Sequence, residues 1–256
     1  MKHIAAMWKK TAFCLLGLIG VSILLLATTT VFFLTLERSE PAAAQAASSA
    51  SPAEGTQSSL DTWEFTGQLE DWRLLLVNNT VSMPDDKLPD LETVGSIQVD
   101  RRIVDDLQAM LEAASGGGVE LTLSSGYRSA ERQEELFQKA VEDNRFLGMN
   151  LEMAEAVAAE SVARAGHSEH NTGLAIDFNG VLETFDETPE YRWLQRHAYE
   201  YGFVFRYPQE KSELTGIRFE PWHFRYVGRE HAEKMRLLNL CLEEYVTYLT
   251  AQQNRS

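Results

Sequence analysis

The sequence predicts an α+β domain that follows an N-terminal apolar segment and a polar linker. Three observations support this prediction. An uncharged run extends from Thr11 to Leu36, and residues 37–60 contain few large apolar side chains. Beyond residue 60, stretches of alternating apolar and polar residues are interspersed with stretches that carry apolar residues at helical spacing. This last part is long enough to enclose one hydrophobic core.

The apolar run 11–36 is predicted to be a transmembrane anchor. At a rise of ~1.5 Å per residue, such a helix can cross a bilayer core of ~30 Å. Lys9 and Lys10 precede the run, which favours residues 1–10 in the cytoplasm and the rest of the chain outside. A cleaved signal peptide is the alternative, because Ala42–Ala46 offers small residues. The run is longer than a usual signal-peptide core, so the uncleaved anchor is preferred.

The segment after the anchor divides into a stalk and a domain. Residues 37–60 are mostly Ala, Ser, Pro, Gln and Glu, which predicts a flexible stalk, and residues 61–256 are assigned to the domain. The net charge of −15 argues against a nucleic-acid partner. Cys14 lies in the apolar run and Cys241 in a predicted helix, so no intramolecular disulfide is expected.

Residue patterns within the domain predict its helices and strands. The expected elements, in chain order, are a strand over 119–124, helices over 129–146 and 151–162, a strand near 173–179, a helix around 189–201, strands near 203–206 and 222–227, and a last helix from about Arg229. Ser129 is a candidate N-cap for the first of these helices. The last helix carries one apolar stripe made of Met235, Leu238, Leu242 and Tyr245.

Two short stretches hold the side chains of a candidate metal site. Between Ser168 and Asp177, His170 is expected on a loop and Asp177 on the strand that follows, so both can approach one ion. His223 opens another strand-like run. Two imidazoles and a carboxylate leave a coordination position open for water, which is the ligand set of a catalytic zinc ion. The sequence therefore predicts that His170, Asp177 and His223 bind zinc.

Glu220 is a candidate general base beside this site. In a regular strand its side chain would point away from that of His223, because the two positions differ by an odd number. Pro221 cannot donate a ladder hydrogen bond, so a break there can turn Glu220 back towards the metal. The remaining histidines are interpreted as surface or structural residues: His3, His167, His197 and His231.

The two stretches resemble the S-x-H-x-x-G-x-A-x-D and E-x-x-H signatures of the VanY-type D-alanyl-D-alanine carboxypeptidases, zinc peptidases related to LD-carboxypeptidases. Further segments agree with this family. Ser125–Ser129, with Gln133 after it, resembles its S-G-Y-R-S segment. Trp72–Asn78 resembles the start of its domain, and Tyr201–Pro208 and Glu220–Gly228 resemble its C-terminal blocks. The resemblance covers roughly residues 70–232.

The resemblance implies a fold and a role for each site residue. The family's fold is a small antiparallel sheet flanked by helices. Zinc would be held by the three predicted ligands, and Glu220 would act as the general base. Arg128 would hold a substrate carboxylate or carbonyl oxygen, for which a guanidinium fork is well suited; the alternative for Arg128 is a solvated cation at a helix start. Gln133, Ser168 and Trp222 would line the substrate pocket.

These expectations describe a membrane-anchored zinc carboxypeptidase. It would remove the C-terminal D-alanine from peptidoglycan stem peptides outside the bacterial membrane, in which it has one span. Two alternatives remain open: an LD-carboxypeptidase that acts on tetrapeptide stems, and a peptidoglycan-binding module that has lost turnover. The presence of Glu220 beside a complete ligand set argues against the second alternative, because a binding module does not need a base.

Overall fold

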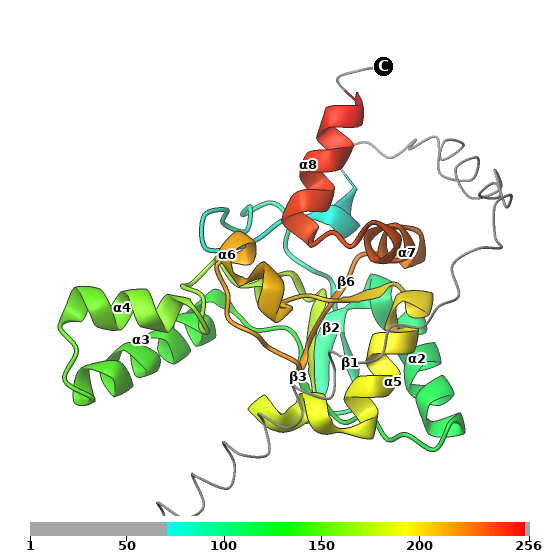
Figure 1. Ribbon diagram of the computed structural model, residues 1–256, viewed down its shortest axis with the longest axis horizontal. Helices are drawn as coiled ribbons and strands as arrows, with labels where there is room; N and C mark the ends of the chain where they lie inside the picture. Colours follow the sequence, from blue (N-terminus) through cyan, green and yellow to red (C-terminus); the bar gives the residue numbers. More distant parts are fainter. Residues whose placement is uncertain (1–70, 254–256) are drawn as a thin grey trace, which may run out of the picture. The chain divides into compact units, whose positions relative to one another are not determined.

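The computed structural model describes residues 71–253. Its elements, in chain order, are η1 (Trp72–Leu74), β1 (Leu91–Val94), β2 (Ile97–Asp100), η2 (Arg101–Ile103), α2 (Val104–Gly116), β3 (Leu123–Ser125), α3 (Ala130–Phe146), α4 (Leu151–Ala159), η3 (Glu169–Thr172), β4 (Ala175–Phe178), η4 (Glu183–Glu187), α5 (Pro189–His197), η5 (Ala198–Tyr201), β5 (Phe203–Phe205), η6 (Gln209–Lys211), α6 (Ser212–Thr215), β6 (His223–Tyr226), α7 (Arg229–Leu238) and α8 (Leu242–Gln253). Helices and short antiparallel strands occur together, which confirms the predicted α+β class (Figure 1).

The predicted transmembrane run 11–36 and stalk 37–60 lie outside the described residues. Within residues 71–253, no helix combines the length and the apolar character that crossing a bilayer requires.

The centre of the domain is a four-stranded antiparallel sheet with the order β3-β4-β6-β5. Every residue of the two inner strands, β4 and β6, is buried. Strands β1 and β2 form a separate hairpin. One face of β4 and β6, with Phe178 and Phe224, packs in the main apolar cluster, whereas Asp177 and His223 lie on the other face.

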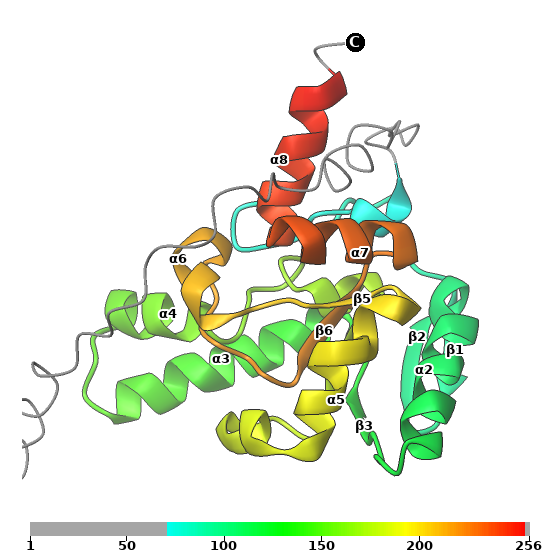
Figure 2. The same ribbon diagram turned by 45° about the vertical axis from the view of Figure 1, so that its right-hand side comes forward.

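Three apolar clusters fill the described domain. The largest packs the sheet against α2 and α5 and includes Leu107, Phe178 and Phe224. A second cluster joins α7 and α8 to the segment that begins at η1. Figure 2 shows α7 lying across the end of the domain close to β5 and β6.

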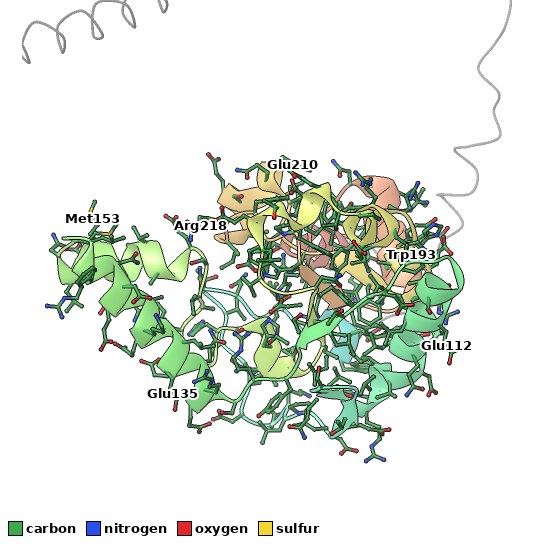
Figure 3. All side chains as sticks on the ribbon, turned by 90° about the horizontal axis from the view of Figure 1, so that it is seen from below. Glu112, Glu135, Met153, Trp193, Glu210 and Arg218 are labelled. Atoms are coloured by element: carbon green, nitrogen blue, oxygen red, sulfur yellow. The ribbon has the colours of Figure 1, made fainter. Side chains whose placement is uncertain are left out.

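Helices α3 and α4 form an arm with a small core of its own. Phe137 and Val141 of α3 pack against Ala154 and Ala158 of α4. Ser129 caps α3 as predicted, because its hydroxyl accepts a hydrogen bond from the Arg132 N–H. Figure 3, in which Glu135 and Met153 mark the arm, shows that it projects from the side of the domain opposite Glu112.

The structure corrects two predicted elements. The last helix is two helices, α7 and α8, because Asn239 adopts a left-handed conformation with φ 53° and ends α7. The strand predicted over 119–124 is limited to β3. Its partner β4 ends at Phe178, and Asn179 turns the chain with φ 55°, so residues 119–122 have no strand to pair with.

Candidate metal centre and substrate cleft

Asp177 and His223 lie at directly paired positions on the two inner strands. Side chains at paired positions of antiparallel strands project from the same face, with Cβ atoms ~4.5–5.5 Å apart. The register between β4 and β6 therefore brings the carboxylate and the imidazole together, and Asp177 Oδ1 lies 3.1 Å from His223 Nδ1. Both side chains are buried.

His170 reaches the same place from the turn η3, which immediately precedes β4. Ser168 caps this turn, and its hydroxyl accepts a hydrogen bond from the His170 N–H at 3.3 Å. Gly173 ends the turn at φ 69°, and a β-carbon there would lie 2.8 Å from the Asp100 nitrogen, so only glycine fits. His170 Nε2 consequently lies 3.2 Å from Asp177 Oδ2.

Each imidazole is held by its second nitrogen. His170 Nδ1 lies 2.6 Å from the carbonyl oxygen of Gly126, and His223 Nε2 lies 3.3 Å from the carboxylate of Glu169. A carbonyl and a carboxylate accept hydrogen bonds and do not donate them. When each imidazole donates to its partner, the lone pairs of His170 Nε2 and His223 Nδ1 face Asp177.

This arrangement fits a metal ion. One ligand atom from each of His170, Asp177 and His223 lies within 4.8 Å of the others, and no other such group occurs among residues 71–253. Asp177 Oδ1 is buried without a hydrogen-bond partner. Lone pairs and an unpaired carboxylate oxygen that converge in a buried place suit a cation between them. Two imidazoles and one carboxylate are a ligand set that zinc accepts.

The ionisation of the ligands agrees with a site for a cation. Burial acts to raise the pKa of Asp177, but the two imidazoles hold it well below its usual range. Burial acts to lower the pKa of His223, yet the carboxylates of Asp177 and Glu169 raise it to about 9. The metal-free site thus takes up a proton on His223, and metal binding would displace it.

Gly126 explains why the backbone can support His170. A β-carbon at Gly126 would lie 2.3 Å from the carbonyl oxygen of Gln98 in β2. The next residue, Tyr127, donates its N–H to the same Gln98 oxygen at 2.6 Å. The chain therefore lies directly on β2, and this contact fixes the carbonyl that accepts from His170.

Glu220 lies before β6, in a turn that returns it to the ligands. The His223 N–H donates to the Glu220 carbonyl at 3.0 Å, which closes the turn around Pro221. Its carboxylate oxygen Oε2 lies 3.7 Å from His223 Nδ1. Burial raises the pKa of the Glu220 carboxyl to about 8. The predicted break at Pro221 thus places a carboxyl of increased basicity beside the metal group.

Arg128 borders the same cleft as Glu220 and is held in a defined orientation. Its guanidinium donates to the Gln133 side-chain oxygen at 2.8 Å and to the Ser125 hydroxyl at 3.0 Å. One of its nitrogens also lies 3.8 Å from Asp177 Oδ2. The side chain keeps 19% of its surface exposed, so part of the fork remains available to a ligand.

Gln133 and Ser168 hold other site residues. Gln133 is 1% exposed; its oxygen accepts from Arg128, and its nitrogen donates to the carbonyl of Ala163 at 2.6 Å. Ser168 caps the turn that carries His170. Both residues border the cleft, and both also orient neighbouring residues of the site.

The cleft in front of the metal group has a volume of about 880 Å³. Trp222 is part of its wall and also packs into the main core. Tyr207, which sequence analysis did not single out, lies against His223 with ring centroids 4.8 Å apart. Its position in the segment 201–208, one of the segments that resemble the family, was the available signal. His167 borders the cleft and hydrogen bonds to the Asn78 carbonyl.

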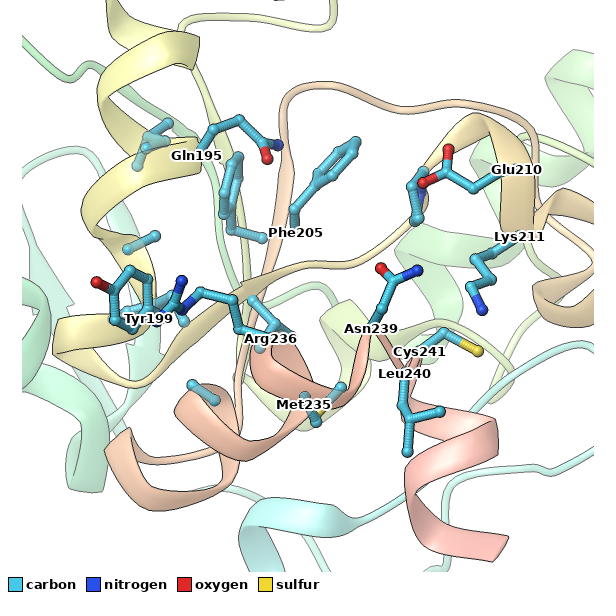
Figure 4. Close-up of a pocket in the computed structure, with 17 residues that line it drawn as sticks. Gln195, Tyr199, Phe205, Glu210, Lys211, Met235, Arg236, Asn239, Leu240 and Cys241 are labelled. Carbon is cyan, nitrogen blue, oxygen red and sulfur yellow. The ribbon is translucent and has the colours of Figure 1, made fainter. Parts of the chain in front are cut away.

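The two other described histidines lie away from this centre. His197 is half-buried and pairs with Glu200, and His231 is buried between Asp71 and Tyr245. A second hollow, of about 200 Å³, lies between β5, η5 and α7 (Figure 4). Its wall includes Phe205 and Met235 but none of the predicted metal ligands.

A buried group of metal ligands that borders a cleft, with the carboxyl of Glu220 and the guanidinium of Arg128 nearby, defines a metal-dependent hydrolase. Comparison with known proteins narrows this class. The family model described as VanY, D-alanyl-D-alanine carboxypeptidase, matches residues 96–229. This range contains every predicted ligand as well as Arg128 and Glu220.

Individual relatives agree with the family model. A D-alanyl-D-alanine carboxypeptidase of Enterococcus faecalis is 40% identical over 193 residues, which are 74% of this chain and 71% of the relative. A mutant of the vancomycin resistance D,D-pentapeptidase VanY, solved in complex with Zn(II), has a TM-score of 0.64 and 41% identity; the match covers 69% of this chain and 99% of that one. The LD-carboxypeptidase LdcB has a TM-score of 0.57 and 35% identity, over 69% of this chain and 87% of that one. The chain belongs to the VanY family of D-alanyl-D-alanine carboxypeptidases.

Proposed function

We propose that this protein is a zinc carboxypeptidase that hydrolyses the terminal D-alanyl-D-alanine bond of peptidoglycan stem peptides and releases D-alanine. The observation that carries the proposal is the convergence of His170, Asp177 and His223, with the buried Glu220 carboxyl beside them. The name of the Enterococcus faecalis relative and the Zn(II) complex of the VanY relative support the substrate and the metal.

The three ligands would hold zinc through one oxygen of Asp177 and the two inward-facing imidazole nitrogens. A zinc ion bound there supplies Lewis acidity, which polarises the scissile carbonyl and makes water more acidic. The protein contributes fixed ligand orientation, because the second nitrogen of each imidazole is already engaged.

Glu220 acts as the general base and then as the general acid. Its carboxylate accepts a proton from the attacking water and afterwards donates a proton to the amine of the departing D-alanine. Its burial serves this role, because a carboxylate in a poorly solvated place accepts a proton more readily than one in water.

Arg128 binds the negative oxygen atoms of the substrate. A carboxypeptidase must recognise a terminal carboxylate, and the tetrahedral intermediate also places negative charge in the site. The hydrogen bonds that Arg128 donates to Ser125 and Gln133 fix the orientation of its guanidinium. Arg128 is therefore already oriented when the substrate arrives.

The decisive experiment is a muropeptide assay with the zinc-loaded protein and its Glu220→Gln variant. The wild type should release D-alanine from pentapeptide stems, and kcat should fall by ~10²–10⁴ in the variant while zinc content and fold are retained. Release from tetrapeptide stems in preference to pentapeptides would establish the LD-carboxypeptidase instead. Binding of both stems without release from either would establish the peptidoglycan-binding module and remove the catalytic role of Glu220.

We also propose that residues 11–36 anchor the protein in the bacterial membrane as a single span, with 37–60 as a stalk and 61–256 as an extracytoplasmic domain. The uncharged run and the lysines at its N-terminal side support this arrangement. A reporter fused after Ser256 should be active only outside the cytoplasm, and the protein should sediment with membranes at full mass. A mature N-terminus near Gln45 would show cleavage and overturn the anchor.

A further inference from the structure

A buried ion network lies directly behind the metal ligand His223. Glu169 stands at its centre, and its side chain has no solvent exposure. One carboxylate oxygen, Oε2, faces His223 Nε2 at 3.3 Å. The other, Oε1, accepts hydrogen bonds from Arg206 Nε at 2.8 Å and Arg225 Nη1 at 3.0 Å. A charged carboxyl is not found in such a place unless its partners are fixed.

The network extends to both ends of the described domain. Arg206 continues to Glu243 on α8, with two hydrogen bonds of 2.9 and 2.6 Å. Arg225 donates to the carbonyl oxygens of Arg73 at 3.2 Å and Leu75 at 2.8 Å, in the segment at η1. Glu169 is thus held by elements that are far apart in the chain.

The charges of the network balance without His223. Glu169 and Glu243 carry two negative charges, and Arg206 and Arg225 carry two positive ones. The carboxylate of Glu169 therefore does not need a charged imidazole as its partner. It can accept a hydrogen bond from a neutral His223, whose Nδ1 lone pair is then directed at the metal site.

The two imidazole ligands are supported differently. His170 donates to a backbone carbonyl, that of Gly126, whereas His223 donates to a charged carboxylate. A hydrogen bond to a carboxylate is stronger and makes the imidazole more electron-rich. Loss of Glu169 should therefore affect both the orientation of His223 and its strength as a ligand.

We infer that Glu169 is a positioning residue of the metal centre, and that Arg206, which follows β5, and Glu243 of α8 hold it in place. This inference deepens the proposed function and rests on its metal site, but not on the identity of the peptide. No residue of the relay from Glu243 to Glu169 touches the cleft in which substrate would bind, except Glu169 at its edge.

The test measures zinc affinity in the full-length protein, purified in mild detergent, by competition with a chromogenic chelator. Glu169→Gln keeps the shape and an acceptor atom but removes the charge, and it should weaken zinc binding by ~10–100-fold. Because this variant leaves two buried arginines with less negative charge and could fail to fold, Glu243→Gln is the second variant. Its carboxylate is at the outer end of the relay, with 16% of the side chain exposed, and zinc affinity should fall by at least about threefold with the circular dichroism spectrum unchanged.

Glu244→Gln is the matched control, because Glu244 is the next residue on α8 and pairs with Lys211 at 2.8 Å, away from the relay. This variant should keep wild-type zinc affinity. Cobalt substitution gives a second measurement. Relative to the wild type, the visible spectrum of bound Co²⁺ should change in Glu169→Gln and Glu243→Gln and stay unchanged in Glu244→Gln. A merely structural role would not alter the metal spectrum of a folded protein.

Wild-type zinc affinity and an unchanged cobalt spectrum in a folded Glu169→Gln variant, or in Glu243→Gln if the former does not fold, would overturn the inference. Equal weakening in Glu243→Gln and Glu244→Gln would also overturn the relay. His170→Ala is measured alongside: wild-type affinity in that variant would show that zinc binds elsewhere, and both the inference and the proposed site would fall. Failure of peptide hydrolysis with normal zinc binding would count against the proposed function alone.

Discussion

Removal of the Glu220 carboxyl should change how the stability of the metal-free protein depends on pH. Burial raises the pKa of this group from 4.5 to about 8. Between these values the folded state binds more protons than the unfolded state, so the free energy of unfolding falls as pH rises. This loss of unfolding free energy is complete once the pH is above the folded-state pKa of about 8. At ~1.4 kcal/mol per pKa unit, it amounts to at most about 5 kcal/mol.

The comparison of wild type with Glu220→Gln isolates this contribution, because the amide does not titrate. Urea unfolding of both full-length proteins, with a chelator present, is followed by tryptophan fluorescence from about pH 4 to about pH 9. The two proteins should be similar in stability at the acid end, and the variant should become the more stable one as pH rises. A stability difference that stays constant with pH would refute the argument from burial. With excess zinc at neutral pH, the wild type should instead be more stable than Glu220→Gln, because a cation favours the charged carboxylate of Glu220.

Further changes test other parts of the structure. His170→Ala should reduce bound zinc from near one per chain to a small fraction in elemental analysis, since a three-ligand site loses one ligand. Gly126→Ala should weaken zinc at least ~10-fold in chelator competition with the helices intact, because its β-carbon would displace the carbonyl that holds His170. Arg128→Lys should lower kcat/KM by ~10–100-fold, because the charge remains but the fork is lost. Phe137→Ala should remove ~3–5 kcal/mol from the arm and speed hydrogen exchange over 130–159 without changing zinc content.

The side chains that meet in the site could be predicted from the sequence, because two local residue patterns indicate how the chain turns there. A polar turn that runs into an apolar strand placed His170 and Asp177 within reach of one ion. Pro221, next to Glu220, signalled the turn that brings this carboxyl back towards His223. Both inferences depend on the backbone preferences of a few consecutive residues, which can be read from the sequence.

Roles that depend on the folded arrangement of side chains were less readable. Gln133 and Ser168 were expected to line the substrate pocket; both border the cleft, and each also holds a neighbouring site residue. Glu169 lies between Ser168 and His170 in the same motif. Nothing in that position reveals that Arg206, just after β5, and Arg225 of β6 both bind it, since these partners are 37 and 56 residues away.

The break between α7 and α8 was hidden for a different reason. Met235, Leu242 and Tyr245 keep helical spacing across the break, and all three are buried in the same cluster. The apolar stripe therefore continues although the helix does not. A single left-handed residue, Asn239, redirects the chain, and hydrophobic periodicity is insensitive to one such residue.

The pairing of Asp177 with His223 links the metal to the correctness of the fold. A slip of one residue between β4 and β6 would send one of these side chains to the other face of the sheet. A misregistered chain then cannot assemble the ligand set, whereas a correctly registered chain can, and ion binding adds its free energy to that pairing alone. Metal binding would thus favour the correct alignment of these two strands over a shifted one.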